Sequence, residues 1–196
     1  MRMIGRLLGL ALIVVLLISQ ALAAKNVIIM IGDGMGFQHL KAGGYYLNGA
    51  SGTLCFEQFF KCSVTTNSLS GTTDSAAAAT ALATGNKAAN GVISQAPDGT
   101  PYLTALEIAK SKGKRTGLVS TVSIKDATPA GFGAHEASRS NLSAVAGDYV
   151  NSSKANVIFG GGDPAKGGSF GVVNITQAKA NGYLDVYNNT NMTGLN

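Results

Sequence analysis

The stretch Gly-Asp-Gly-Met-Gly at residues 32–36 follows directly on the apolar run Asn26-Val-Ile-Ile-Met-Ile31. A continuous apolar run ahead of a glycine-rich turn predicts a strand buried on both faces, as in a parallel sheet. Ligands of open parallel sheets bind at the carboxyl ends of the strands. Asp33 is therefore a candidate functional carboxylate, although a plain turn role also accounts for many Asp-Gly pairs.

Downstream segments alternate between helix-like and strand-like patterns. Helices are predicted at 37–47, 75–84, 103–112, 136–149 and around 175–181. Strands are predicted at 63–67, 115–122 and 156–159, and residues 86–101, with their Asn-Gly and Asp-Gly pairs, are turn-rich. This alternation predicts an α/β fold with a mostly parallel sheet of about four strands.

Composition excludes several classes of protein. Of the 196 residues, 45% are hydrophobic and 13% are charged, which is too apolar for a disordered chain and too poor in charge for a coiled coil. The 26 glycines come with only 4 prolines and without a Gly-X-Y period, so a collagen-like chain is excluded as well.

The N-terminal segment has the organisation of a signal peptide. Arg2 and Arg6 precede an apolar run over 7–18, and Ala21-Leu-Ala23 gives a small-x-small cleavage pattern. We therefore expect residues 1–24 to be removed and the protein to be exported, to the periplasm or the extracellular space, without a stable membrane anchor; an uncleaved anchor is the alternative. Since two of the 15 basic side chains lie in this segment, 13 remain against 10 acidic ones, too weak an excess for a nucleic-acid partner.

Cys55 and Cys62 are the only cysteines. Their spacing does not suggest a structural zinc site. Either a small-loop disulfide or two separate buried thiols fits the pattern.

Ser75 lies where an alanine-rich helix is predicted to begin. The sequence Thr72-Thr-Asp-Ser75 leads into Ala76–Ala79. A helix N-terminus favours an anion, which makes Ser75 a candidate phosphate-binding residue. The alternative is that Ser75 or Asp74 only caps the helix. The small alanines reflect either helix propensity or a need for open access to the hydroxyl.

A third cluster follows the strand predicted at 115–122. Asp126 and Thr128 offer hard oxygen ligands of the kind Mg²⁺ prefers, and Arg139 offers a planar fork for phosphate. Alternatively, Asp126 precedes a proline turn and Arg139 lies on a solvated helix face. For His135, a core or supporting role is favoured over direct metal ligation.

Together the three motifs resemble the N-terminal half of alkaline phosphatases. They are the strand and turn ending at Gly36, Thr73-Asp-Ser-Ala-Ala continuing to Gly85, and Asp126-Ala-Thr-Pro-Ala continuing to Ser138-Arg139. The resemblance covers about residues 25–162. It implies a three-layer αβα sandwich with a mostly parallel sheet, incomplete in this chain, with residues 25–196 as the N-terminal portion of that domain.

The resemblance also implies a metal site with two Zn²⁺ ions and one Mg²⁺ ion in a complete family member. Ser75 would be a ligand of one zinc, and Asp33 would bridge that zinc to Mg²⁺. Asp126 and Thr128 would serve the Mg²⁺ site.

The implied reaction is hydrolysis of small phosphate monoesters through a phosphoserine. Ser75 would be the nucleophile, Arg139 would hold two phosphate oxygens, and Asp74 would orient Arg139. A homodimer is a further expectation for the complete protein.

The chain departs from the family in its metal ligands. Family zinc sites take several His and Asp ligands from the second half of a chain about twice this long. Here the histidines are His39 and His135, and three aspartates follow Arg139. Because each zinc needs about three protein ligands, we expect a fragment that binds zinc poorly and turns over little substrate.

Two other functions fit the same residues. One is a different hydrolase of the superfamily, a phosphodiesterase or a sulfatase. The other is a non-catalytic exported binding or surface module, in which the Asn- and Thr-rich C-terminal part is an interaction surface.

Overall fold

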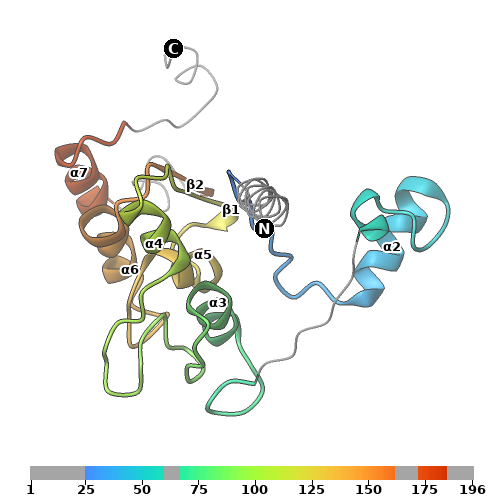
Figure 1. Ribbon diagram of the computed structural model, residues 1–196, viewed down its shortest axis with the longest axis horizontal. Helices are drawn as coiled ribbons and strands as arrows, with labels where there is room; N and C mark the ends of the chain where they lie inside the picture. The colour runs from blue at the N-terminus through green and yellow to red at the C-terminus, as the bar shows by residue number, and fades with distance from the viewer. Residues whose placement is uncertain (1–24, 60–66, 162–171, 185–196) are drawn as a thin grey trace, which may run out of the picture. The chain divides into compact units, whose positions relative to one another are not determined.

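The computed structural model describes residues 25–59, 67–161 and 172–184 (Figure 1). These residues fall into two compact units, which divide between Ser51 and Gly52. The described elements are helices α2 (Phe37–Asn48), α3 (Ser75–Thr84), α4 (Ala105–Ser111), α5 (Ala127–Gly133), α6 (Leu142–Asp148) and α7 (Val172–Ala180), short helices η1 (Cys55–Gln58) and η2 (Tyr149–Ser153), and strands β1 (Gly117–Ser123) and β2 (Val157–Gly161).

In the first unit, the predicted turn and helix are present. The Met35 N–H donates to the Gly32 carbonyl at 3.1 Å, and Gly34 has a φ of 68°, in the left-handed region that glycine adopts without strain. Asp33 lies exposed within this turn. Helix α2 then ends at Gly49, whose φ of 71° and N–H bond to the Tyr45 carbonyl make it a C-cap.

The buried strand predicted at 26–31 is not confirmed. The segment forms no strand in the described part of the chain, and the side chains of Val27, Ile28 and Met30 are 76–90% exposed. The prediction is wrong because a central strand needs neighbours for its backbone N–H and C=O groups. The described sheet has two strands, and they pair with each other.

In the second unit, β1 and β2 form a parallel pair with Leu118 opposite Ile158. Both were predicted, with bounds shifted by one or two residues. Leu118 faces the core, whereas Val119 is 73% exposed. The parallel pair and its helices confirm the α/β class, and the exposed strand residues show that no described helix of the second unit covers one face of this sheet.

Helices α3 and α5 pack against each other at the centre of this unit (Figure 1). A Cβ on Gly131 of α5 would lie 2.6 Å from Cβ of Ala79 and 2.9 Å from its carbonyl carbon. Ala76, Ala79 and Thr80 are at most 1% exposed. The alanines therefore serve close helix packing, a third reason besides helix propensity and open access to the Ser75 hydroxyl.

Two helices differ from prediction. Helix α5 is not among the predicted helices, and its sequence, Ala127 to Gly133, contains one proline and two glycines. Pro129 is tolerated because it lies in the first turn, where backbone N–H groups have no partner within the helix. The helix predicted at 136–149 begins only at Leu142, because the Glu136 backbone pairs with Ile93 instead.

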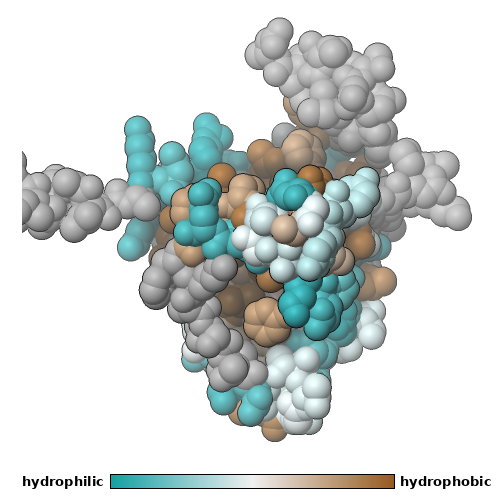
Figure 2. Space-filling view, turned by 90° about the vertical axis from the view of Figure 1, so that its right-hand side faces the viewer, coloured by the Kyte–Doolittle hydropathy of each residue, from teal (hydrophilic) through white to brown (hydrophobic). Residues whose placement is uncertain are grey.

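Several predictions fall outside the described residues, among them the signal peptide, most of the strand predicted at 63–67, and Cys62. Cys55 is exposed. Among the described residues, none of the helices has the length and apolar character needed to cross a membrane. Figure 2 shows hydrophobic side chains lying at the surface among hydrophilic ones.

Candidate functional site

The N-terminus of α3 places Ser75 beside a fixed carboxylate. Asp74 is the N-cap, and its Oδ1 accepts from the Ala77 N–H at 2.9 Å. Ser75 is therefore the first helical residue, and the cap is Asp74. Gly85, with a φ of 74°, ends the helix as predicted.

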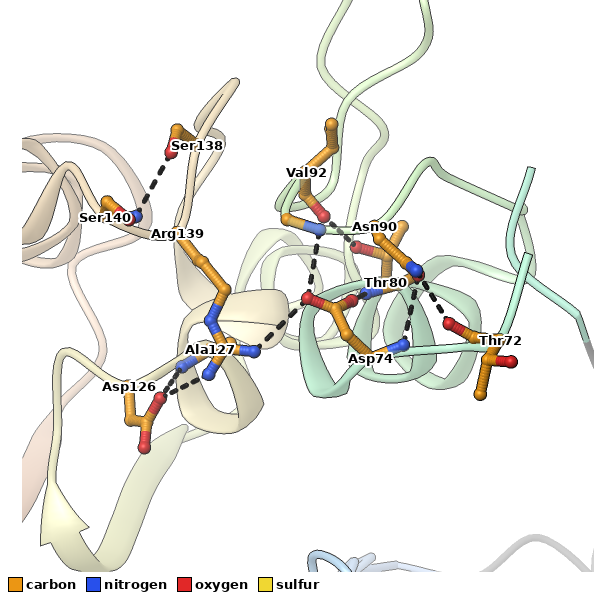
Figure 3. Close-up of polar contacts among 12 residues, drawn as sticks. Thr72, Asp74, Thr80, Asn90, Val92, Asp126, Ala127, Ser138, Arg139 and Ser140 are labelled. Carbon is orange, nitrogen blue, oxygen red and sulfur yellow. Dashed lines mark hydrogen bonds and ion pairs between the residues drawn. The ribbon is translucent and has the colours of Figure 1, made fainter. Parts of the chain in front are cut away.

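Arg139 lies between the caps of two helices (Figure 3). Its Nη1 donates to Asp74 Oδ2 at 3.2 Å, and its Nη2 donates to Asp126 Oδ1 at 2.8 Å. Asp126 is the N-cap of α5, with the same Oδ1 accepting from the Ala127 N–H at 2.7 Å. One guanidinium group thus joins the residue before Ser75 to the carboxylate expected to serve a metal.

The packing of α3 on α5 explains why one side chain spans both caps. Arg139 comes from the irregular segment before α6, and its backbone N–H donates to the Gly91 carbonyl at 2.7 Å. Its side chain is 33% exposed, against 27% for Asp74 and 45% for Asp126. The ion pairs therefore remain open to solvent and to small ligands.

Not every candidate residue joins this cluster. Thr128 follows Asp126 by two positions on the first turn of α5 and is half-buried. Asp33 belongs to the other compact unit. The structure thus brings Ser75, Asp74, Arg139, Asp126 and Thr128 into one unit.

The described residues do not form a complete metal site. Within the part of the chain that the structure describes, no three His, Cys, Asp or Glu side chains are grouped so that they could hold a metal ion. Asp126 and Thr128 provide suitable oxygens, but Asp126 Oδ1 already accepts from Arg139 and Ala127. This donor set of the described residues is too small for a two-zinc centre.

His135 belongs to a separate, more buried cluster. Its Nε2 lies 2.9 Å from Glu107 Oε1, and its Nδ1 lies 3.0 Å from the Ser94 carbonyl oxygen. Because both partners only accept, both ring nitrogens carry protons when both bonds form, and the ring is then a cation. The side chains of His135 and Glu107 are 12% and 17% exposed, which makes this a supporting ion pair.

The pair changes the pKa of both partners. Burial alone lowers the pKa of His135, but the bond to Glu107 and the Ser94 carbonyl outweigh burial and raise it above 6.5. Burial raises the pKa of Glu107, yet the Thr104 N–H and the His135 ring outweigh it and hold the pKa below 4.5. Each partner therefore stabilises the charged form of the other.

Sequence reasoning missed three residues around these clusters: Asn90, Gly91 and Glu107. The Asn-Gly pair was assigned to a turn, and nothing local shows that this turn reaches Asp74. Glu107 had a readable signal, because Thr104 and Glu107 have the capping-box spacing, and the box forms.

Comparison with known proteins shows the family of the chain. Residues 24–166 match the alkaline phosphatase family, and the chain belongs to that family. Alkaline phosphatase 3 of Bacillus subtilis is 43% identical in an alignment of 150 residues that covers 70% of this chain and 32% of that protein. The chain thus spans about a third of the length of the curated relatives it matches.

Solved structures extend the similarity to the fold. The cold-active alkaline phosphatase of a psychrophilic Shewanella has a TM-score of 0.75 and 36% identity, over 84% of this chain and 42% of that one. A variant of the enzyme from the Antarctic bacterium TAB5, solved with Mg bound in its M3 site, has a TM-score of 0.67 and 33% identity over 80% of this chain and 45% of that one. The α/β fold with a parallel sheet is therefore an incomplete alkaline-phosphatase-like fold.

Proposed function

We propose that this chain carries the nucleophile and the phosphate-binding arginine of a phosphate monoester hydrolase. The observation that supports the proposal best is the ion pair between Arg139 and Asp74, the residue that directly precedes Ser75. It ties the only guanidinium of the cluster to the N-terminus of α3. A phosphoryl group above this helix end would meet both Ser75 and Arg139.

In the proposed reaction, Ser75 Oγ attacks the phosphorus of a small phosphate monoester in line. A bond forms between Oγ and phosphorus, the bond from phosphorus to the ester oxygen breaks, and the alcohol leaves with a proton. Water then attacks the phosphoserine, which releases inorganic phosphate and restores the Ser75 hydroxyl. Two nitrogens of Arg139 are assigned to two phosphoryl oxygens, with Asp74 orienting the guanidinium.

The net charge of the cluster indicates that cations are needed for phosphate binding. Two carboxylates and one guanidinium give the cluster of Asp74, Asp126 and Arg139 a formal charge of −1. A phosphate dianion is repelled by such a cluster unless cations are added. We propose that Zn²⁺ and Mg²⁺, the cations that the family resemblance implies, supply the positive charge. The candidate ligands are Asp33, Ser75, Asp126 and Thr128, and because this set is small we expect poor turnover by this chain alone.

Trapping the intermediate tests the proposal without requiring fast turnover. The full chain is mixed with p-nitrophenyl phosphate, Zn²⁺ and Mg²⁺, quenched in acid and analysed by mass spectrometry. A phosphoryl group on the peptide that contains Ser75 is the expected result. Ser75→Ala removes it, whereas Ser111→Ala, at the exposed end of α4, retains it.

Other outcomes contradict the proposal. A label that persists in Ser75→Ala places the nucleophile elsewhere, and no label with any ester favours a non-catalytic module. A label obtained from a phosphate diester or sulfate ester, but not from a monoester, identifies a different hydrolase of the superfamily. Export of the protein and dimerisation of the complete enzyme remain separate proposals.

A further inference from the structure

We propose that the Asn90-Gly91 turn is a positioning element that sets where the Arg139 guanidinium lies relative to Ser75. The inference rests on the proposed function, in which that guanidinium binds phosphate. The turn acts on the guanidinium indirectly, through Asp74 and through the backbone of Arg139.

Gly91 closes a ring of hydrogen bonds. Its N–H donates to Asp74 Oδ2 at 3.0 Å, and its carbonyl accepts from the Arg139 N–H at 2.7 Å. The same Asp74 Oδ2 accepts from Arg139 Nη1 at 3.2 Å. One peptide segment therefore fixes the carboxylate that orients the guanidinium and also the main chain from which the guanidinium extends.

Asn90 fixes the other side of Asp74 (Figure 3). Its Oδ1 accepts from the Asp74 N–H at 3.0 Å, and its Nδ2 donates to the Thr72 carbonyl at 2.6 Å. Its own N–H donates to Ser70 Oγ at 2.7 Å. The side-chain amide thus takes up backbone groups on the segment leading to Ser75, which leaves Asp74 little freedom to rotate away.

Gly91 is required for its backbone conformation. Its φ is 81°, which side chains rarely adopt, and a Cβ built there has no neighbour within 4 Å. An alanine therefore causes no collision; it strains the backbone, and relief of that strain turns the N–H and C=O that hold Asp74 and Arg139.

Gly99 provides a matched control for an ordinary turn glycine. Its φ is 85°, it too has no atom within 4 Å of a built Cβ, and its N–H donates to the nearby Ala96 carbonyl. Alanine at Gly99 introduces the same backbone strain away from Asp74 and Arg139. Asn86, whose Nδ2 donates to the Thr84 carbonyl at 3.1 Å, is the control for Asn90.

The experiment uses the full chain with ¹⁵N-labelled arginine and four variants: Gly91→Ala, Gly99→Ala, Asn90→Ala and Asn86→Ala. NMR measures solvent exchange of the Arg139 Nη protons, and a titration with inorganic phosphate in the presence of Mg²⁺ measures its Kd. We expect faster Nη exchange in both variants of the turn and a rise in Kd of about tenfold, equivalent to the loss of about 1.4 kcal/mol of binding free energy. The control variants should match the unchanged chain in both measurements.

The two measurements separate the two proposals. If the Arg139 Nη protons exchange at the same rate in Gly91→Ala and Gly99→Ala, the positioning role is overturned, regardless of the phosphate Kd. If Arg139→Ala leaves the phosphate Kd unchanged, the proposed function fails, while faster Nη exchange in the turn variants still supports positioning of the side chain. Equal effects of all four variants identify a general loss of stability and overturn the inference.

Discussion

Two cationic side chains on one short segment are held in contrasting ways. His135 meets Glu107 and a carbonyl in a site that leaves its side chain 12% exposed, and both ring nitrogens are used. Arg139, four residues later, is 33% exposed and shared between two carboxylates that belong to two helices. In the first arrangement both ring nitrogens of His135 already have hydrogen-bond partners. In the second, the two ion pairs use only some of the guanidinium N–H groups of Arg139, and the others can bind another partner.

The two arrangements suit different roles: the His135 pair stabilises the fold, and the Arg139 cluster can bind a ligand. A buried ion pair whose polar atoms are all satisfied stabilises one conformation and has nothing to offer a ligand. A solvent-accessible pair contributes little to stability, so a ligand can replace one of its bonds at low cost. The two clusters should therefore respond to mutation in opposite ways.

The largest expected effect is on stability, from Glu107→Ala. This change leaves His135 without its anion and removes the acceptor of the Thr104 N–H, which lies 2.9 Å from Glu107 Oε2. We expect the free energy of unfolding to fall by about 2–3 kcal/mol, measured by urea denaturation, with the phosphate Kd unchanged.

Glu57→Ala is the matched control. Glu57 accepts from the Leu54 N–H at 3.0 Å in the same local geometry, but it forms no ion pair with a histidine among the described residues. It should lower the unfolding free energy by only about 0.5–1 kcal/mol. Equal losses in the two variants would show that the His135 pair contributes nothing beyond capping.

Arg139→Lys should weaken phosphate binding and leave the unfolding free energy nearly unchanged, the opposite of Glu107→Ala. A single ammonium lacks the planar fork, so it cannot reproduce both contacts and binds phosphate as a point charge. We expect the phosphate Kd, measured by titration, to rise about tenfold while the unfolding free energy changes by less than about 1 kcal/mol. The exposed Arg115 offers a control, Arg115→Lys, which should change neither. A large loss of stability in Arg139→Lys would place Arg139 in the same class as His135.

The smallest effect is the dependence of stability on pH. The raised pKa of His135 means that its contribution is complete below its ordinary value near 6.5 and is lost as pH rises through the folded-state pKa. The lowered pKa of Glu107 means that its contribution is complete above about 4.5 and is lost as pH falls through the folded-state pKa. Thermal denaturation should show the greatest benefit of the pair between these values, and His135→Gln should remove the alkaline loss. An alkaline loss that persists in this variant assigns it to other groups.

Local signals were sufficient for much of the site. Ser75 was placed at a helix start from the alanine-rich run and Gly85, and these signals lie within the helix itself. The Gly32–Gly36 turn was found for the same reason. Arg139 and Asp74 were related to each other only through the family resemblance, because no local pattern connects residues so far apart in the sequence.

The failures share a physical cause, which is dependence on distant partners. The strand predicted at 26–31 has the right side chains, but the described part of its own unit contains no strand with which its backbone could pair. Residues 136–141 have helix-compatible sequence, yet their backbone groups pair with 91–93. The Asn90-Gly91 turn was recognised as a turn, but its bonds to Asp74 depend on where the rest of the chain folds.

The contact between Ala79 and Gly131 has a consequence for how this region tolerates sequence change. Because a Cβ at Gly131 would lie 2.6 Å from the Ala79 Cβ, α3 and α5 are too close together to accommodate one additional methyl group between them. The distance between the N-caps Asp74 and Asp126 therefore depends on the small size of Ala79 and Gly131, which lie several residues further along the two helices. Among relatives, we expect the side-chain volumes at positions 79 and 131 to vary together. The reason is that the helix spacing they set must still allow one arginine to contact both N-cap carboxylates.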